Sequence, residues 1–232
     1  MVEKSRLHLV WDWNGTVLND FDVAMRSTNS SFRDFGLPEI TAARYRALLR
    51  TPVRGFYAAV LGRDPSDEEC DFLESSFHTY YPLYEKEAAL SSGLPDLFRQ
   101  WHDAGHTQSL LSLYPHDELV AAVERHGLTS YFALVQGAAP PDPEQKAVAD
   151  HLSVLKVDPA AAVLIGDLVD DAHAAGRAGV SVVLYSGGWG APADLAATGA
   201  PVADSLAEAV ELIDSHLPSS QVAFDLGRGG RI

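Results

Sequence analysis

Cysteine and long apolar runs are scarce in this chain of 232 residues, which contains the single cysteine Cys70. One cysteine excludes an internal disulfide framework and a cysteine-rich zinc site, and we expect Cys70 to fill an apolar interior. The charged residues Glu3, Lys4 and Arg6 precede only a short apolar run, which indicates neither a signal peptide nor a membrane span. We therefore expect a cytoplasmic protein.

Positive charge is also scarce. Lys and Arg together number 17 against 32 Asp and Glu, which gives a formal net charge of -15. Because nucleic acids and anionic membranes are recognised by clustered cations, we expect neither of them as a partner. A small anionic substrate is compatible with this charge, since a bound metal ion reverses the sign of the field in a pocket. The sequence does not indicate an oligomeric state.

The stretch from Leu7 to Thr16 organises the rest of the chain. Its apolar first half is followed at once by Asp12, Asn14 and Gly15. An apolar run of this length predicts a strand buried on both faces, as in a parallel sheet. Open α/β sheets bind their ligands at the carboxyl ends of such strands, so Asp12 is a candidate functional residue. Taken alone, the stretch is equally compatible with a buried strand that ends in a polar turn.

Residues 20 to about 90 show helical patterns and no strand pattern. Four segments are expected, bounded by Asp20 and Phe35, by Thr41 and Thr51-Pro52, by Phe56 and Gly62, and by a capping box at Ser66 and the aromatic Tyr80. We interpret residues 19–91 as a helical insertion.

From Gly93 onward, short apolar strands alternate with helices. The expected strands are 108–112, 132–135, 162–165 and 180–185, and the expected helices are 94–104, 117–126, 143–156, 170–178, one from Pro192 and one capped by Ser205. This alternation predicts an α/β fold, with a Rossmann-like parallel sheet that carries helices on both faces. Residues 1–18 and 92–218 would form this core, and the glycine-rich residues 219–232 would form a mobile tail.

Polar side chains lie at the ends of further strands. Ser112 ends one strand, Asp167 and Asp171 follow another, and Lys146 lies near the start of the helix between them. Each has an ordinary explanation by itself, because a helix favours acids in its first turn and most lysines are solvated. In a parallel sheet, however, these strand ends meet at one edge, so their combination with Asp12 indicates a site.

The combination resembles the four motifs of the haloacid dehalogenase-type (HAD) hydrolases, and residues 19–91 resemble their small α-helical cap. The phosphoglycolate phosphatase-like members are the most similar, through Asp158-Pro159 to Gly179-Val180 and through residues 199–206. The resemblance covers nearly the whole chain apart from the tail. It is carried by the motifs Asp12-Trp13-Asn14-Gly15-Thr16, Ser112, Lys146 and Gly166-Asp167-Leu168-Val169-Asp170-Asp171.

The resemblance implies a magnesium-dependent phosphatase that acts on a small phosphorylated metabolite, with phosphoglycolate-like compounds as the nominal substrates. Asp12 would be the nucleophile and would form an aspartyl-phosphate. The magnesium ligands would be Asp12, the main-chain carbonyl of Asn14 and Asp167, while Asp171 would hold one of the metal's waters or orient the metal shell.

The resemblance also implies the groups that contact the phosphate. Ser112 would donate a hydrogen bond to a phosphoryl oxygen, and Lys146 would neutralise both the nucleophile and the transferring group. Thr16 is expected among the substrate-binding residues. Arg50 and Arg54 lie where such caps present a specificity loop, and either could clamp a second anion of the substrate. The alternative for both arginines is an exposed position at a helix end.

Asn14 departs from the family pattern, because most of these phosphatases have a second aspartate two residues after the nucleophile. That aspartate donates and accepts protons, and an amide cannot do so at neutral pH. Its loss typically costs roughly 10²–10⁴-fold in rate. A catalytically weak or inactive relative that binds phosphate or a phospho-metabolite is therefore the alternative function. A dehalogenase would leave Asp167 and Asp171 unexplained, and no cap lysine indicates phosphonate cleavage.

Overall fold

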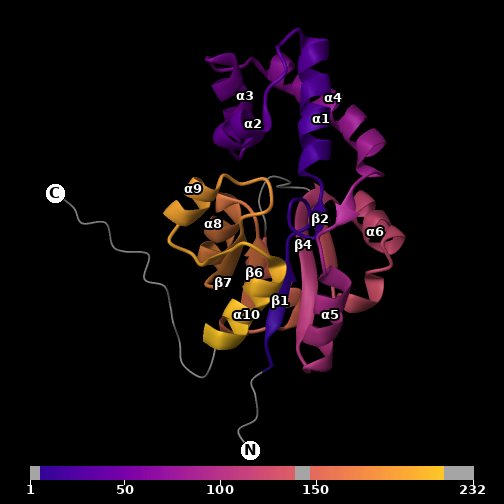
Figure 1. The fold of residues 1–232 in the computed structure, drawn as a ribbon, viewed down its shortest axis with the longest axis vertical. Helices are drawn as coiled ribbons and strands as arrows, with labels where there is room; N and C mark the ends of the chain where they lie inside the picture. Colours follow the sequence, from indigo (N-terminus) through magenta and orange to yellow (C-terminus); the bar gives the residue numbers. More distant parts are fainter. Residues whose placement is uncertain (1–5, 139–146, 217–232) are drawn as a thin grey trace, which may run out of the picture.

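The structure is a computed structural model that describes residues 6–138 and 147–216, with the side chains of residues 214–216 left out. The six strands of its central sheet are all parallel and lie in the order β5-β4-β1-β6-β7-β8 (Figure 1). Their bounds are β1 His8–Trp11, β4 Thr107–Pro115, β5 Val135–Ala138, β6 Ala162–Gly166, β7 Ser181–Tyr185 and β8 Val202–Ala203. The predicted α/β fold with a parallel sheet is confirmed.

Strand β1 occupies the centre of the sheet. The chain moves outward from β1 to β4 and β5, and then returns to the other side of β1 for β6, β7 and β8. The strand order therefore reverses at β1, and ligand crevices of open α/β sheets form at this switch point. Asp12 directly follows Trp11, the residue of β1 that pairs with Leu110 on one side and Ile165 on the other.

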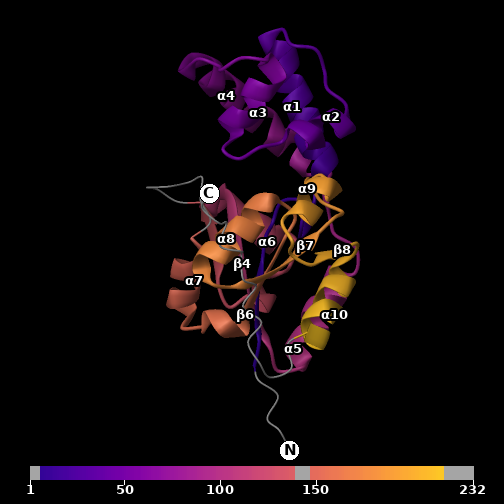
Figure 2. The ribbon, with the colours of Figure 1, turned by 90° about the vertical axis from the view of Figure 1, so that its left-hand side faces the viewer.

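Alternating side chains of the sheet pack into two apolar clusters. One cluster contains Leu9 and Trp11 and is completed by helices α5 (Leu94–Asp103), α6 (His116–Arg125) and α10 (Leu206–His216). The other contains Val10 and is completed by α7 (Val148–Leu155) and α8 (Val169–Ala178) (Figure 2). Because both faces are covered, a continuous apolar run was the correct signal for β1. A further short helix, α9 (Pro192–Ala197), follows β7.

Four helices lie in the sequence between the short strands β2 (Leu18–Asn19) and β3 (Ala89–Leu90), which pair antiparallel. They are α1 (Phe21–Phe35), α2 (Ala42–Leu48), α3 (Val53–Leu61) and α4 (Asp67–Glu85), and they stand over one end of the sheet (Figure 1). Thr41 caps α2, Ser66 and Glu69 form the expected capping box of α4, and Cys70 is buried among these helices. The domain limits at residues 18/19 and 91/92 stay a prediction.

Three expectations for the strands were wrong. The region 20–90 does contain a strand, β3, because the chain pairs with itself where it leaves and re-enters the sheet domain. Strand β4 continues to Pro115, which pairs with Ala138, instead of ending at Ser112. Strand β5 lies at 135–138 rather than 132–135, since Phe132 packs against Phe98 before the strand begins.

Three expectations fall outside the described residues, namely the start of a helix at 143, the site residue Lys146 and a tail from 219. The helix that ends near Lys156 is described from Val148 onward. Ser205 accepts a hydrogen bond from the Glu208 amide (3.1 Å) and caps α10 as predicted. No helix within the described ranges is long and apolar enough to cross a membrane.

Candidate active site

Three buried carboxylates meet at the carboxyl edge of the sheet. Asp12 follows β1, Asp167 follows β6, and Asp171 belongs to the first turn of α8. One ligand oxygen from each lies within 4.8 Å of the others, and the side chains are 5%, 0% and 1% exposed. Like charges at this spacing repel one another when buried, and hard oxygen ligands are those that magnesium prefers. The residues therefore fit the divalent cation that the sequence predicts.

Hydrogen bonds hold two of these carboxylates in place. Asp167 accepts from the Thr16 hydroxyl (3.1 Å) and from the Trp189 main-chain amide (2.6 Å). Asp171 uses one oxygen to accept from the amides of Asp167 (3.0 Å) and Leu168 (2.9 Å). Asp171 thus stabilises the start of α8, as a first-turn acid does, and also faces the cluster. Thr16 contacts Asp167, and its predicted contact with substrate stays a prediction.

Two glycines make room for Asp167. A Cβ atom built on Gly15 or on Gly188 would lie 2.3 Å from its Oδ2 atom. Gly15 also has a positive φ of 76°, which a residue with a side chain rarely adopts. The sharp turn after β1 therefore brings the backbone directly against the carboxylate of the neighbouring strand.

The Asn14 side chain faces the base of the inserted helices. Its Nδ2 donates to Asp20 Oδ2 (2.8 Å) and to the Tyr81 hydroxyl (2.8 Å). Asp20 precedes α1 and Tyr81 belongs to α4, so the amide is held from both chain segments that join the inserted helices to the sheet.

Asp20 has four donors around its two oxygens. Oδ1 accepts from the Gly15 amide (2.8 Å) and the Trp189 indole (2.9 Å), and Oδ2 accepts from Asn14 and from the Tyr81 hydroxyl. The sequence predicted that Asp20 caps α1. It occupies the cap position, but its side chain makes no cap hydrogen bond, because these four donors already use both oxygens.

The titration of this group follows from its surroundings. Burial raises the pKa of Asp20, and the hydrogen bonds from Tyr81, Asn14, Gly15 and Trp189 oppose that rise. Burial and the neighbouring Asp20 raise the pKa of Tyr81, so its hydroxyl keeps its proton. Since every neighbour of Asp20 in this group is a donor, the ionised carboxylate is the form that matches the geometry.

Ser112 lies in β4, beside β1, and is 3% exposed. Its hydroxyl accepts a hydrogen bond from the Tyr114 amide (3.1 Å) in a stretch where the register of β4 against β5 shifts. The hydroxyl hydrogen can therefore be donated to another group. Lys146 lies outside the described residues, so its contact with phosphate stays a prediction.

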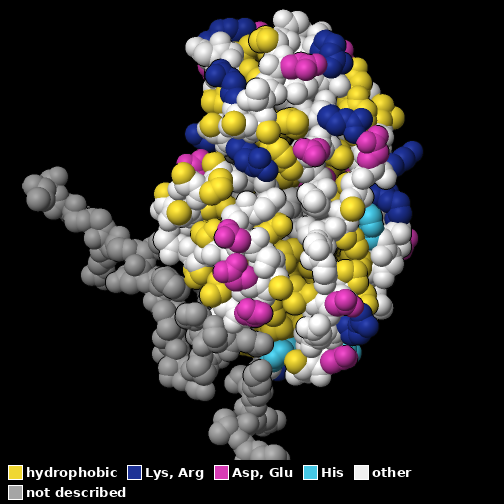
Figure 3. Space-filling model, viewed as in Figure 1, with side chains coloured by type: hydrophobic (Ala, Val, Ile, Leu, Met, Phe, Trp, Pro, Cys, Tyr) yellow, Lys and Arg dark blue, Asp and Glu magenta, His cyan; other side chains and the backbone are white. Residues whose placement is uncertain are grey.

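A cleft of about 450 Å³ separates the inserted helices from the sheet domain. The inserted helices contribute Arg46, Leu49, Arg50 and Thr51, and the opposite wall contains Leu168, Val169, Asp170, His173 and residues of α9 with the loop before it. Arg46 donates to the Gly188 carbonyl (3.1 Å), and Arg50 lies 4.0 Å from Asp194. On the face shown in Figure 3, most Lys and Arg side chains gather over the inserted helices.

The two predicted specificity arginines are placed differently. Arg50 lines the cleft, whereas Arg54 does not. The Arg54 guanidinium binds Asp64 (3.2 Å), Asp67 (2.8 Å) and the Pro65 carbonyl, all near the start of α4. Of the two predicted specificity arginines, Arg50 therefore lines the cleft between the inserted helices and the sheet domain, and its contact with substrate stays a prediction.

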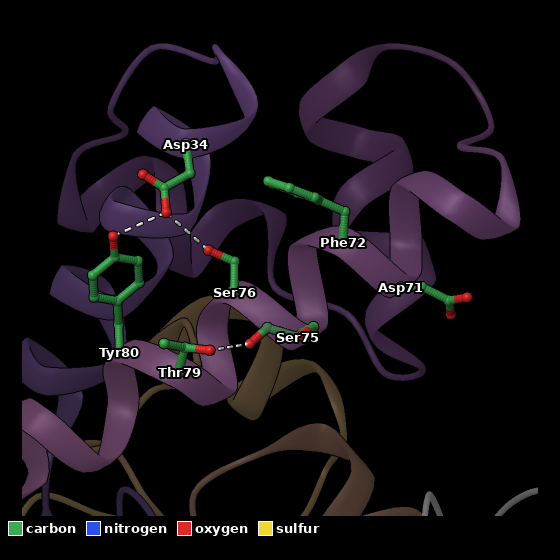
Figure 4. Close-up of a pocket in the computed structure, with 7 residues that line it drawn as sticks. All are labelled: Asp34, Asp71, Phe72, Ser75, Ser76, Thr79 and Tyr80. Carbon is green, nitrogen blue, oxygen red and sulfur yellow. Dashed lines mark hydrogen bonds between the residues drawn. The ribbon is translucent and has the colours of Figure 1, made fainter.

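A second hollow, of about 510 Å³, lies on the outer side of the inserted helices. Like the cleft, it is lined by none of the three clustered carboxylates, but the cleft includes Leu168 and Asp170, which are chain neighbours of Asp167 and Asp171. Figure 4 shows that Asp34 of α1 faces Ser76 and Tyr80 of α4 there, and both hydroxyls donate to it (3.3 and 2.9 Å). These bonds connect two helices, so we assign this hollow no part in the site.

Sequence reasoning missed Tyr81, Trp189 and Arg46 and misread Asp20. An acid before a helix is usually a helix cap, and nothing in the sequence indicated that the Asp20 side chain turns toward Asn14. The tryptophan in the glycine-rich stretch 187–190 was the one visible signal, because a large aromatic among glycines usually has a packing role. Trp189 packs against the inserted helices and donates to both Asp20 and Asp167.

Comparison with protein families gave a match over residues 9–185 to the family described as haloacid dehalogenase-like hydrolase. A phosphoglycolate phosphatase of Cupriavidus necator is 27% identical over 224 residues, which cover 91% of this chain and 93% of that protein. A phosphoglycolate phosphatase of Synechococcus elongatus is 23% identical and covers 78% of this chain and 84% of that one.

Solved structures share the fold over almost the whole chain. A predicted phosphatase from Clostridium acetobutylicum superposes with a TM-score of 0.79 at 17% identity, covering 91% of this chain and 100% of that one. A haloacid dehalogenase-like protein from Streptococcus pneumoniae gives a TM-score of 0.78 at 19% identity, covering 90% and 98%. At these identities the likeness concerns the fold alone.

Proposed function

Because this chain belongs to the haloacid dehalogenase-like hydrolase family, we propose that it is a magnesium-dependent phosphatase of a small phosphorylated metabolite. The predicted resemblance of the chain to that family is confirmed, and its relatives are named as phosphatases. The observation that carries the proposal is the buried trio Asp12, Asp167 and Asp171 at the switch point of the sheet.

The nucleophile of the proposed reaction is Asp12. Its carboxylate attacks phosphorus, the bond to the leaving oxygen breaks, and an aspartyl-phosphate forms. The electron pair of the broken bond stays on the leaving oxygen, which takes a proton from solvent water because Asn14 has none to give. Water then attacks this phosphorus and returns Asp12 to its free form. Ser112 donates to a phosphoryl oxygen, and Lys146 balances the charge on the transferring group.

The side chains of Asp12 and Asp167 and the carbonyl of Asn14 would hold magnesium, with Asp171 orienting the shell. The bound ion would supply positive charge that offsets the repulsion between Asp12 and the phosphate. Thr16 and the Trp189 amide keep Asp167 in the orientation that this role requires.

We propose a phosphoglycolate-like substrate, in which a carboxylate accompanies the phosphate. The name of the Cupriavidus relative supports this class, and Arg50 in the cleft offers a guanidinium for the second anion. Helices α1–α4 would act as the cap that closes over the substrate. A catalytically weak protein that binds such a metabolite is the second candidate, because Asn14 supplies no exchangeable proton.

A panel of phosphorylated metabolites tests this function by release of phosphate with magnesium and with EDTA. We expect magnesium-dependent release that is lost in Asp12→Asn and kept in Asp22→Asn, whose acid lies exposed on α1. Phosphoglycolate should be among the preferred compounds. Release that survives in Asp12→Asn would contradict the proposed nucleophile. Binding of phosphate without turnover would instead favour the second candidate.

A further inference from the structure

Asn14 carries no proton for catalysis, yet its amide is held by two buried partners. Its Nδ2 has two hydrogens, and the two acceptors at 2.8 Å, Asp20 and Tyr81, use both of them. Tyr81 in turn donates to Asp20, so the three side chains form a closed triangle of hydrogen bonds. Asp20 and Tyr81 are 0% and 3% exposed, so water does not compete for these bonds.

The triangle determines which way the amide points. An ionised carboxylate accepts hydrogen bonds and cannot donate, so Nδ2, and never Oδ1, must face Asp20. The two arms of a planar amide diverge. With Nδ2 turned toward Asp20 and Tyr81, Oδ1 is turned away from both and is left as an acceptor.

Asp20 cannot itself replace the missing acid–base group in this arrangement. Both of its oxygens already accept two hydrogen bonds, and the side chain has no exposed surface. A substrate or a water molecule would have to displace the Gly15 amide, the Trp189 indole, Asn14 or Tyr81 in order to reach it. Its effect must therefore pass through Asn14.

We propose that Asp20 and Tyr81 are positioning residues that lock the Asn14 amide with Oδ1 as a hydrogen-bond acceptor for the attacking water. The inference rests on the proposed phosphatase function. In the second step the water oxygen bonds to phosphorus, and the Asp12 oxygen leaves with the electron pair of its bond. The released proton passes to a phosphoryl oxygen, and the product is dihydrogen phosphate. Oδ1 orients the water and takes no proton.

The partners of Asp20 also connect the Asn14 amide to the rest of the site. Gly15 and Trp189 occupy the other oxygen of Asp20, and Trp189 also donates to Asp167. The same group of residues therefore fixes the motif turn, the start of α1 and a carboxylate of the proposed metal site.

The test replaces Asp20 with asparagine, which keeps the shape and removes the charge. The new amide must turn its own Nδ2 toward some of the four donors, and Asn14 has to rotate to offer Oδ1 to it. We expect kcat on alkyl phosphates to fall roughly 10²-fold with KM changed little, and phosphorylated Asp12 to accumulate after rapid quenching. Asp22→Asn removes an exposed acid from the same helix and should change none of these quantities.

A second variant keeps the inference testable if Asp20→Asn does not fold. Tyr81→Phe deletes only the hydroxyl, so one of the two amide hydrogens loses its acceptor, and we expect a smaller fall in kcat of the same kind. Tyr80→Phe is its matched control, because Tyr80 bonds Asp34 on the outer side of α1 and α4. Unchanged kcat in both Asp20→Asn and Tyr81→Phe would overturn the proposal.

Nuclear magnetic resonance of the Asn14 side-chain amide separates this inference from the proposed function. Two resolved amide protons, protected from solvent exchange in the parent and unprotected in Asp20→Asn, would support the lock even in a protein without turnover. Equal protection in both would overturn it. Failure of the parent to form phosphorylated Asp12 from any substrate would instead count against the phosphatase function.

Discussion

Replacing Asn14 with aspartate would put a second carboxylate 2.8 Å from Asp20, at the place where the amide nitrogen now lies. Two ionised groups at that distance repel by about 6 kcal/mol at an effective dielectric constant of about 20. Taking up one proton at pH 7 costs only about 4 kcal/mol for a carboxyl whose unfolded pKa is about 3.9. We therefore expect the pair to share one proton and Asn14→Asp to be about 4 kcal/mol less stable than the parent.

The sign of the pH dependence follows from that proton. The pKa of the folded pair lies above the unfolded value, so the folded variant binds more protons and its relative stability rises as pH falls. At pH 5 the difference from the parent should shrink to about 1.5 kcal/mol. Urea unfolding of both proteins at pH 7 and at pH 5 measures this difference directly.

The exchanged pair Asn14→Asp with Asp20→Asn is the matched control. It keeps one carboxylate and one amide, and the new amide at position 20 can donate to the new carboxylate at position 14, so its stability should return close to that of the parent. The proton shared in Asn14→Asp supplies an acid, and alkyl phosphate turnover should rise roughly 10²-fold. An Asn14→Asp variant as stable as the parent at pH 7 would refute the predicted repulsion.

Other parts of the molecule give three further expectations. Magnesium at about 100 times its dissociation constant should stabilise the parent by about 2.7 kcal/mol in thermal unfolding, and Asp167→Asn should gain nothing. Arg50→Ala should raise KM for carboxylate-bearing phosphates roughly tenfold, whereas Arg54→Ala should leave selectivity unchanged. Burial lowers the pKa of His8 and of His151 to about 4. The positive charge of Arg6 lowers the pKa of His8 further, and the neighbouring His8 lowers that of His151 further. The unfolded chain then binds more protons, so urea unfolding should show about 2 kcal/mol lost per histidine between pH 7 and pH 5.

Each of these expectations has a result that would contradict it. Asp170→Asn, a change in the same turn outside the carboxylate trio, should keep the magnesium effect, and an equal loss there would remove the assignment to Asp167. A selectivity change in Arg54→Ala would contradict its role within the inserted helices. His151→Gln should lose less stability between pH 7 and pH 5 than the parent, because the side chain at position 151 then takes up no proton in the unfolded chain.

The alternation of strands and helices along the chain, and the polar residues at the strand ends, could be predicted from the sequence alone. Buried parallel strands are recognisable in a sequence as apolar runs. Their carboxyl ends lie at the same edge of the sheet, independent of the conformation of the loops. That geometry brings Asp12, Asp167 and Asp171 together without further information. The helix caps at Thr41, Ser66 and Ser205 could also be predicted, because the side chain of a cap bonds a backbone amide only a few residues away.

The limits of single elements were predicted less well, because packing overrides local pattern. Phe132 looks like a strand residue and lies instead in the turn before β5, where it fills space beside Phe98. Arg54 looks like a loop arginine near a substrate, yet three acceptors near the start of α4 bind it. Neither outcome follows from residue type or spacing.

Only the tertiary structure decided what surrounds Asn14. Asp20, Tyr81 and Trp189 come from the start of α1, from α4 and from the loop after β7, and no periodic pattern connects them. The packing of α4 against α1 brings the Tyr81 hydroxyl to Asp20, and the fold of the sheet brings the Trp189 indole to its other oxygen. Hydrogen bonds between side chains so far apart in the sequence depend on where whole helices and loops pack. The motifs therefore determined the protein family. The packing around Asp20 determined which way the Asn14 amide is turned.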